Sequence, residues 1–167
     1  MDNGDSMVAR IAKTARAAAT AVSELLTIPI VGRIGASLPV PMPGIDSGSY
    51  FDAETTVEIA ASSLSAREKA SDLFALEVDG HSMIDAMVND GDIVIMKRAQ
   101  TANNGEMVAV WLEDNQETTL KYFYKENGRV RLQPANPTMD PIIINNPEQV
   151  RIQGKVVMIV RQLKPVD

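Results

Sequence analysis

From residue 73 onward the sequence consists of short runs rich in apolar and β-branched residues, separated by polar, glycine-containing and proline-containing clusters. The runs are LFALEV (73–78), DIVIM (92–96), EMVAVWL (106–112), TTLKYFY (118–124), RVRLQP (129–134), PIIIN (141–145), VRIQG (150–154) and KVVMIVRQL (155–163). Strands this closely spaced predict a mainly β domain built from antiparallel hairpins. The segment SMIDAMVNDGD interrupts the series and is predicted to form one helical turn before a tight turn.

The chain before residue 73 follows other patterns. Apolar residues recur at spacings of three and four over residues 7–26, which predicts a helix. Its basic residues Arg10, Lys13 and Arg16 lie off the apolar stripe, and they form either a solvated face or a DNA-contacting face. One helix is too little for a helix-turn-helix, which needs at least two packed helices.

Residues 27–49 contain four prolines and four glycines, which excludes a helix. The first part, TIPIVGRIG, predicts an extended strand, and PVPMPG predicts a linker. Residues 50–70 are ambiguous and could hold a short helix capped by Ser63 or Ser65.

Composition removes several kinds of chemistry. The 167 residues include no cysteine and one histidine, His81, so disulfides, thiolate sites and zinc sites with several imidazoles are excluded. A net charge of −6 argues against a non-specific nucleic-acid binder. We find neither an apolar run of membrane-spanning length nor a secretory signal, so the expected location is the cytoplasm.

The remaining candidate nucleophile is a serine. Ser82 follows a Gly-His turn, and Lys121 lies in an otherwise apolar and β-branched strand 39 residues later. Burial would lower the pKa of a lysine enough for its neutral amine to activate a serine. The alternatives are a water-facing Lys121 and a Ser82 that only caps a helix or turn. His81 is a poor base for Ser82, because neighbouring side chains of an extended segment point to opposite faces.

These residues carry a resemblance. GHSMIDAMVNDGDIVIM resembles the nucleophile motif of the LexA/UmuD family, the self-cleaving serine peptidases of the bacterial SOS response. ETTLKYF resembles the strand that supplies the family's lysine, with Leu120 where valine is usual, and QGKVVMIVRQL resembles its closing strand. The segment from Leu132 to Ile142, with Pro134, Asn136 and Pro141, is similar to the family's L-x-P-x-N-x-x-x-x-P-I motif. The match covers about residues 29–163, with the motifs in the family's order.

The resemblance implies a mechanism. IPIVGRIGASLPVP is similar to the family's cleavable segment, which puts the scissile bond between Ala36 and Ser37, with a cut after Gly35 as the alternative. Ser82 would attack this bond with Lys121 as general base and then general acid, and backbone N–H groups of His81 and Ser82 would form the oxyanion hole. No metal and no cofactor are implied. The implied partners are a second copy of the chain, giving a homodimer, and a RecA filament on single-stranded DNA as co-protease.

The resulting domain prediction has three parts: an N-terminal helical segment (1–26), a cleavable segment with its linker (27–70), and a LexA-type peptidase and dimerisation domain (71–167). We expect the catalytic domain of a LexA-type repressor, with operator DNA bound only through a DNA-binding domain that this chain lacks. The alternative is a UmuD-like accessory subunit of an error-prone polymerase. A related signal peptidase would need a membrane anchor, which we do not find.

Overall fold

The computed structural model describes residues 7–12, 24–35, 55–65, 68 and 70–166. Within these ranges, nine strands make up one sheet: β1 (Leu25–Ile34), β2 (Thr56–Ala60), β3 (Leu73–Val78), β4 (Ile93–Arg98), β5 (Met107–Leu112), β6 (Glu117–Glu126), β7 (Arg129–Gln133), β8 (Ile142–Ile144) and β9 (Val150–Val160). The same described residues include four short 3-10 helices: η1 (Ala61–Ser63), η2 (Ala70–Asp72), η3 (Ile84–Ala86) and η4 (Pro147–Gln149). The predicted mainly β fold is confirmed, and η3 is the predicted helical turn.

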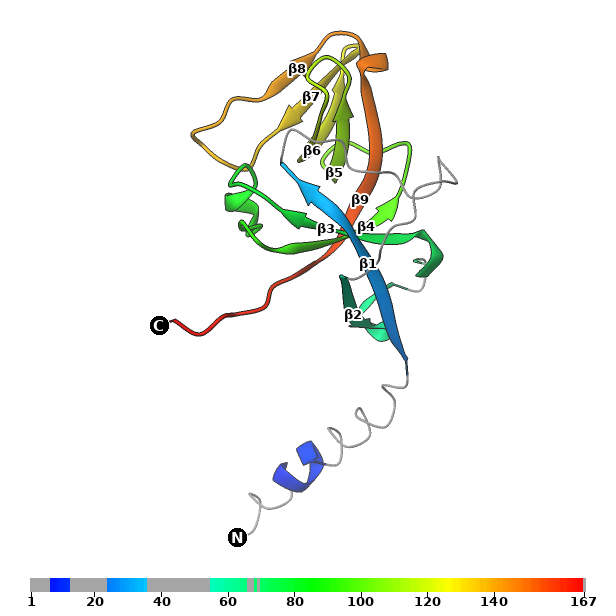
Figure 1. Cartoon of the computed structure of the whole chain (residues 1–167), viewed down its shortest axis with the longest axis vertical. Coiled ribbons are helices and arrows are strands. Elements are labelled where there is room, and N and C mark those ends of the chain that lie inside the picture. Colours follow the sequence, from blue (N-terminus) through cyan, green and yellow to red (C-terminus); the bar gives the residue numbers. More distant parts are fainter. Residues whose placement is uncertain (1–6, 13–23, 36–54, 66–67, 69, 167) are drawn as a thin grey trace.

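The strand order is β2-β1-β3-β4-β9-β5-β6-β7-β8, and most neighbouring strands run antiparallel. Figure 1 shows β9 running through both halves of the molecule, with β5 to β8 on one side and β1 to β4 on the other. Its C-terminal part pairs with β4, and its N-terminal part pairs with β5. The strand therefore joins the two groups into one sheet.

The two runs predicted over 150–154 and 155–163 merge into the single strand β9, which ends at Val160, three residues before the predicted end. In the sequence pattern Gly154 suggests the end of one strand and the start of another, but it lies inside β9. A β-carbon there would lie 2.9 Å from the carbonyl oxygen of Lys97 and 3.1 Å from the ring of Phe74. Glycine is thus required by close packing within the strand rather than by a turn.

The start of the chain corrects one prediction. Residues 7–12 are helical as expected, but Leu25 and Leu26 belong to β1, where they pair with Ala60 and Ile59 of β2. Their apolar side chains fit the helical spacing, which is why the sequence predicts a helix there. They form a strand instead, because they pair with a strand more than thirty residues away. The helix predicted over 13–23 lies outside the described residues.

Strand β1 is also the exception to the antiparallel arrangement. After its pairing with β2, its C-terminal half runs parallel to β3, with Ile34 opposite Val78. A parallel partner can come from distant parts of the chain, which hairpin patterns do not predict. The part of the chain predicted as cleavable segment and linker thus contributes two strands to the sheet.

Buried side chains gather in three clusters, one of which underlies the site described below. This cluster is made of Val31, Ile34, Phe74, Leu76, Val78, Met83, Val88, Val94, Met96, Ala109 and Leu120. It joins the end of β1, the strand β3, the loop around η3 and the strand β6. No helix in the described part of the chain has the length and apolar character needed to span a membrane.

Candidate functional site

Lys121 is buried in the middle of β6, with 7% of its surface exposed. On β6 it follows Leu120 and precedes Tyr122, and it lies opposite Val108 of β5. Apolar and β-branched residues on both strands make this part of the sheet a favourable place for burial. The prediction that Lys121 is buried is therefore confirmed.

The amine of Lys121 has three hydrogen-bond partners. Its Nζ donates to Thr119 Oγ1 at 2.6 Å, to the carbonyl of Leu120 at 3.1 Å and to Ser82 Oγ at 3.1 Å. An ammonium group has three N–H donors, so all three are used. After loss of one proton, two N–H groups remain for Thr119 and Leu120, and the lone pair can accept from the Ser82 hydroxyl.

Burial lowers the pKa of Lys121 from 10.5 to about 8, and a smaller coulombic effect of Glu117 opposes this shift. Desolvation penalises the charged ammonium more than the neutral amine. A substantial fraction of the side chain is therefore neutral just above physiological pH. This is the property that a general base for a serine needs.

Ser82 is held in a short loop between β3 and η3. Gly80 has a φ of 107°, a conformation that favours glycine, and its N–H donates to Asp90 Oδ1 at 2.8 Å. Next to Ser82, the side chain of Met83 is only 2% exposed and packs into the core cluster that joins β1, β3 and β6. The loop is thus fixed on both sides of the serine, which is itself half-buried.

The end of β1 reaches this site. The carbonyl of Ile34 accepts from the N–H of Asp79, and the N–H of Gly35 donates to the carbonyl of Thr118 at 3.4 Å. Gly35 has a φ of 107°, and a β-carbon there would collide with the carbonyl oxygen of Asp79. The chain therefore passes between the strand that precedes Ser82 and the strand that carries Lys121.

The other predicted site residues have different placements. The side chain of His81 is exposed. Ala36 and Ser37, the predicted scissile pair, lie outside the described residues, directly after Gly35. Within the described ranges, no three or more His, Cys, Asp or Glu residues come together in a group that could hold a metal ion.

Comparison with known proteins places this geometry in a family. Residues 29–157 match the family described as Peptidase S24-like. The chain belongs to this family. It is 46% identical over 137 residues to a LexA repressor of Roseiflexus sp. (strain RS-1), and 43% identical over 136 residues to one of Herpetosiphon aurantiacus. It is 42% identical over 142 residues to the LexA repressor of Bacillus subtilis (strain 168).

These matches cover 81–83% of the chain and 60–61% of the relatives. The chain thus spans about three fifths of the length of the curated relatives it matches. They show that it is a LexA-type S24 peptidase domain, as its motifs suggested.

The S24 domain also holds an ion pair between a buried carboxylate and a partly exposed arginine, which the sequence motifs do not indicate. Asp92, 2% exposed, accepts from Nε and Nη2 of Arg161, both at 2.7 Å, and from the N–H of Asn89 at 2.7 Å. Arg161 also donates to the carbonyl of Met87 at 2.8 Å. The end of β9 is thereby tied to the turn that follows η3. Asp92 belongs to the quoted motif, but nothing in the sequence pattern indicates its partner 69 residues away.

Replacement of Arg161 by methionine is expected to lower the melting temperature of the domain, because the buried Asp92 carboxylate loses its partner. The Arg161 side chain is 40% exposed, so the loss should be smaller than that for a fully buried ion pair. Thermal unfolding at neutral pH measures the loss. The control is Arg151→Met, which removes a 72% exposed arginine paired with Glu113 and is expected to change stability little.

The same pair predicts an acid dependence. The hydrogen bonds from Arg161 lower the pKa of Asp92 below 3.8, so the folded state favours the carboxylate. The stabilisation is present above the pKa of the unfolded state and is lost as the pH falls through the lower folded value. The difference in stability between the parent and Arg161→Met should therefore shrink on acidification. An equal difference at neutral and strongly acidic pH would contradict this account of the pair.

Proposed function

We propose that this domain cleaves its own chain between Ala36 and Ser37 with Ser82 as nucleophile and Lys121 as base. The observation that carries the proposal is the 3.1 Å contact between Lys121 Nζ and Ser82 Oγ, made by a lysine whose burial lowers its pKa to about 8. Gly35, which directly precedes the predicted scissile pair, lies between the strand that precedes Ser82 and the strand that carries Lys121. Membership of a peptidase family agrees with this chemistry.

The proposed reaction has two halves. The Oγ of Ser82 attacks the carbonyl carbon of Ala36 while its proton passes to Nζ of Lys121, and N–H groups of His81 and Ser82 stabilise the negative oxygen. Lys121 then gives the proton to the amide nitrogen of Ser37, which leaves as a free amine. Water hydrolyses the Ser82 ester with Lys121 again as base. The products are a carboxylate at residue 36 and an amine at residue 37.

The proposed substrate is a segment of the same chain, so its placement next to Ser82 takes the role that binding affinity has for a separate substrate. The pairing of β1 with β3 and the bond from Gly35 to Thr118 hold Gly35, the residue before the proposed scissile pair, beside β3 and β6, which supports docking of the segment at the dyad. Intramolecular placement of this kind is worth effective concentrations of about 10⁵ M or more when the geometry is right. A second consequence is that docking of the segment excludes water from Lys121 and favours its neutral form.

At the level of the whole protein, we propose a LexA-type repressor of the SOS response. The LexA repressors that match the chain support this assignment over a UmuD-like accessory subunit. Operator binding, dimerisation, and stimulation of cleavage by RecA filaments on single-stranded DNA are parts of this proposal that follow from the family resemblance. The addition of such filaments near neutral pH is expected to accelerate the cleavage.

Incubation of the purified chain at alkaline pH tests the proposal. We expect two fragments to appear with a first-order rate constant that is independent of protein concentration, because nucleophile and substrate belong to one molecule. Gel electrophoresis over a tenfold range of concentration is sufficient. An intact chain after prolonged alkaline incubation, or a rate constant proportional to concentration, would contradict intramolecular cleavage.

A further inference from the structure

The segment after β7 contacts the nucleophile loop through a set of hydrogen bonds to its backbone. The side-chain amide of Asn136 donates from Nδ2 to the carbonyl of His81 at 2.9 Å. The N–H of Ala135 donates to the carbonyl of Ser82 at 2.8 Å, and the carbonyl of Ala135 accepts from the N–H of Asp85 at 2.8 Å. Two consecutive carbonyls of the loop are thus held from one side.

The orientation of the Asn136 amide follows from its other partners. Its Oδ1 accepts from the N–H and from the hydroxyl of Thr138, at 2.9 and 2.7 Å. A backbone N–H can only donate, so the oxygen must face Thr138 and the NH₂ group must face His81. The His81 carbonyl also accepts from the N–H of Ile84, but at the longer distance of 3.3 Å.

A held carbonyl fixes the N–H of the same peptide unit. In a trans peptide the C=O and the N–H point to opposite sides, and the described residues contain no cis peptide bond. The bond from Asn136 to the His81 carbonyl therefore turns the N–H of Ser82 away from the Asn136 side. The side chain of Asn136 needs no contact with the substrate to have this effect.

We propose that Asn136 is the positioning residue of the oxyanion hole, because its amide holds the His81 carbonyl so that the Ser82 N–H faces the carbonyl under attack. The inference rests on the proposed self-cleavage and adds a residue to it. Asn136 acts on the peptide unit beside the nucleophile and leaves the base Lys121 unchanged. It should therefore alter the rate at which the neutral dyad reacts, and not the pH at which the dyad becomes active.

Asn136→Asp is the most selective variant. The carboxylate keeps an acceptor for Thr138, removes the donor to His81 and adds a negative charge, for which the neutral variant below and the matched control account. We expect the cleavage rate on the alkaline plateau to fall by about 10-fold to 100-fold, somewhat less than the loss of an oxyanion donor itself. The melting temperature should stay close to that of the parent. A second, neutral variant, Asn136→Leu, should lower the plateau rate in the same way.

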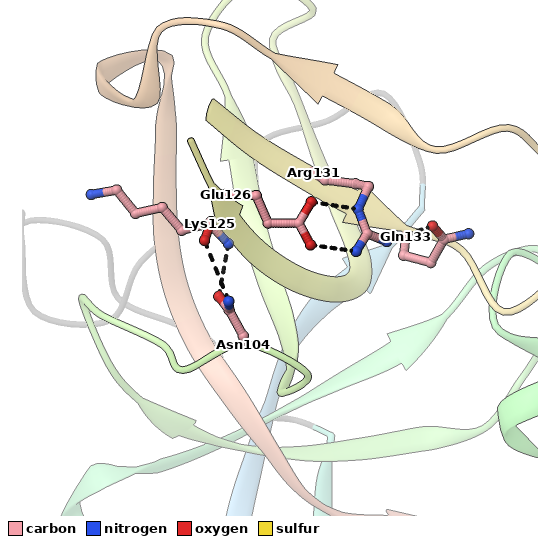
Figure 2. Close-up of polar contacts among 5 residues, drawn as sticks. All are labelled: Asn104, Lys125, Glu126, Arg131 and Gln133. Atoms are coloured by element: carbon pink, nitrogen blue, oxygen red, sulfur yellow. Dashed lines mark hydrogen bonds and ion pairs between the residues drawn. The ribbon is translucent and has the colours of Figure 1, made fainter. Parts of the chain in front are cut away.

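Figure 2 shows the matched control, Asn104. Its amide also donates to a backbone carbonyl and accepts from a backbone N–H, both of Lys125, but on the β4–β5 connection away from the dyad. Asn104→Asp introduces the same charge and removes the same kind of bond, and it should cleave at the parent rate.

A second readout does not depend on cleavage. The ¹⁵N resonance of the Ser82 amide responds to the hydrogen bond on the preceding carbonyl, so it should move in Asn136→Asp and stay in Asn104→Asp. The spectra are recorded at about pH 6, well below the Lys121 pKa of about 8, where cleavage is slow.

Failure of the parent to cleave would overturn the proposed function. Parent-like cleavage by Asn136→Asp, an unmoved Ser82 resonance, or an equal loss in Asn104→Asp would overturn the role of Asn136 alone.

Discussion

Replacement of Ser82 by alanine is expected to stop self-cleavage, with a rate at least about 10⁴-fold below that of the parent. In the proposed mechanism Ser82 Oγ forms the covalent intermediate with Lys121 as base. Lys121 Nζ also donates to the hydroxyl of Thr119, so this variant tests which of the two hydroxyls reacts. Lys121→Met should have a comparable effect, because the methionine fills the same space and cannot accept a proton. The double variant should be no slower than either single one, since the two residues act as a unit.

Controls for these variants are available in the same chain. Ser63 is an exposed serine on η1, and Lys125 is an exposed lysine on the same strand as Lys121. Ser63→Ala and Lys125→Met should both cleave at the parent rate. Fragment formation is followed by gel electrophoresis under alkaline conditions. Cleavage by Ser82→Ala at more than a few per cent of the parent rate would assign the nucleophile to another residue.

The second large effect is the dependence of the reaction on pH. Only neutral Lys121 can take the proton from Ser82, and burial sets its pKa at about 8. The rate should rise about tenfold per pH unit below this value and level off above it, a change of about 100-fold between pH 6 and pH 9. A flat profile in this range, or a rise that continues to pH 10.5 as for an exposed lysine, would contradict the role of burial.

Stability provides an independent measure of the same pKa. The folded pKa of about 8 lies below the ordinary value of 10.5, so between these values the unfolded chain binds more protons than the folded one. The free energy of unfolding should therefore rise with pH across this window, by up to about 3 kcal/mol. The measurement uses Ser82→Ala, which does not cleave, against Ser82→Ala with Lys121→Met. An absence of any difference in slope between them would show that Lys121 is not desolvated in the folded state.

Much of the fold can be predicted from the sequence because its hairpins are local. The strands β3 to β8 begin and end within a few residues of the predicted runs, since turn signals such as KENG fix where each strand stops. The site is predicted only in part by the pattern. The apolar strand around Lys121 favours its burial, which the pairing of β6 with β5 and β7 provides, but the pattern also allows a water-facing lysine. The pairing of Lys121 with Ser82 is implied by the family resemblance.

What the sequence could not predict depends on contacts between distant segments. Leu25 and Leu26 fit a helix by spacing, and only pairing with β2 makes them part of a strand. The parallel pairing of β1 with β3 brings the segment before residue 36 to the dyad, and no local signal indicates it. Asn136 stood out as a motif residue without a role, because its partner His81 lies 55 residues earlier. Arg161 carries no motif that would point to Asp92.

In the proposed mechanism three parts of the fold have complementary tasks. The strand β6 would provide the buried base, the loop around η3 would provide the nucleophile, and β1 would lead to the substrate segment. The first two meet in the 3.1 Å contact between Lys121 and Ser82. The third is anchored as well, because β1 pairs with both β2 and β3 and its side chains Ile28 and Ile34 are only 2% and 1% exposed.

The most direct test of the central claim is intact-mass analysis of the products after alkaline incubation of the parent and of Ser82→Ala. We expect two products from the parent, residues 1–36 and 37–167, whose masses exceed that of the intact chain by one water in total, and no products from Ser82→Ala. A cut one residue earlier, after Gly35, would leave the assignment of Ser82 and Lys121 unchanged and would correct only the position of the scissile bond. An intact parent, a cut away from residues 35–37, or the same products from Ser82→Ala would contradict self-cleavage by Ser82 and Lys121.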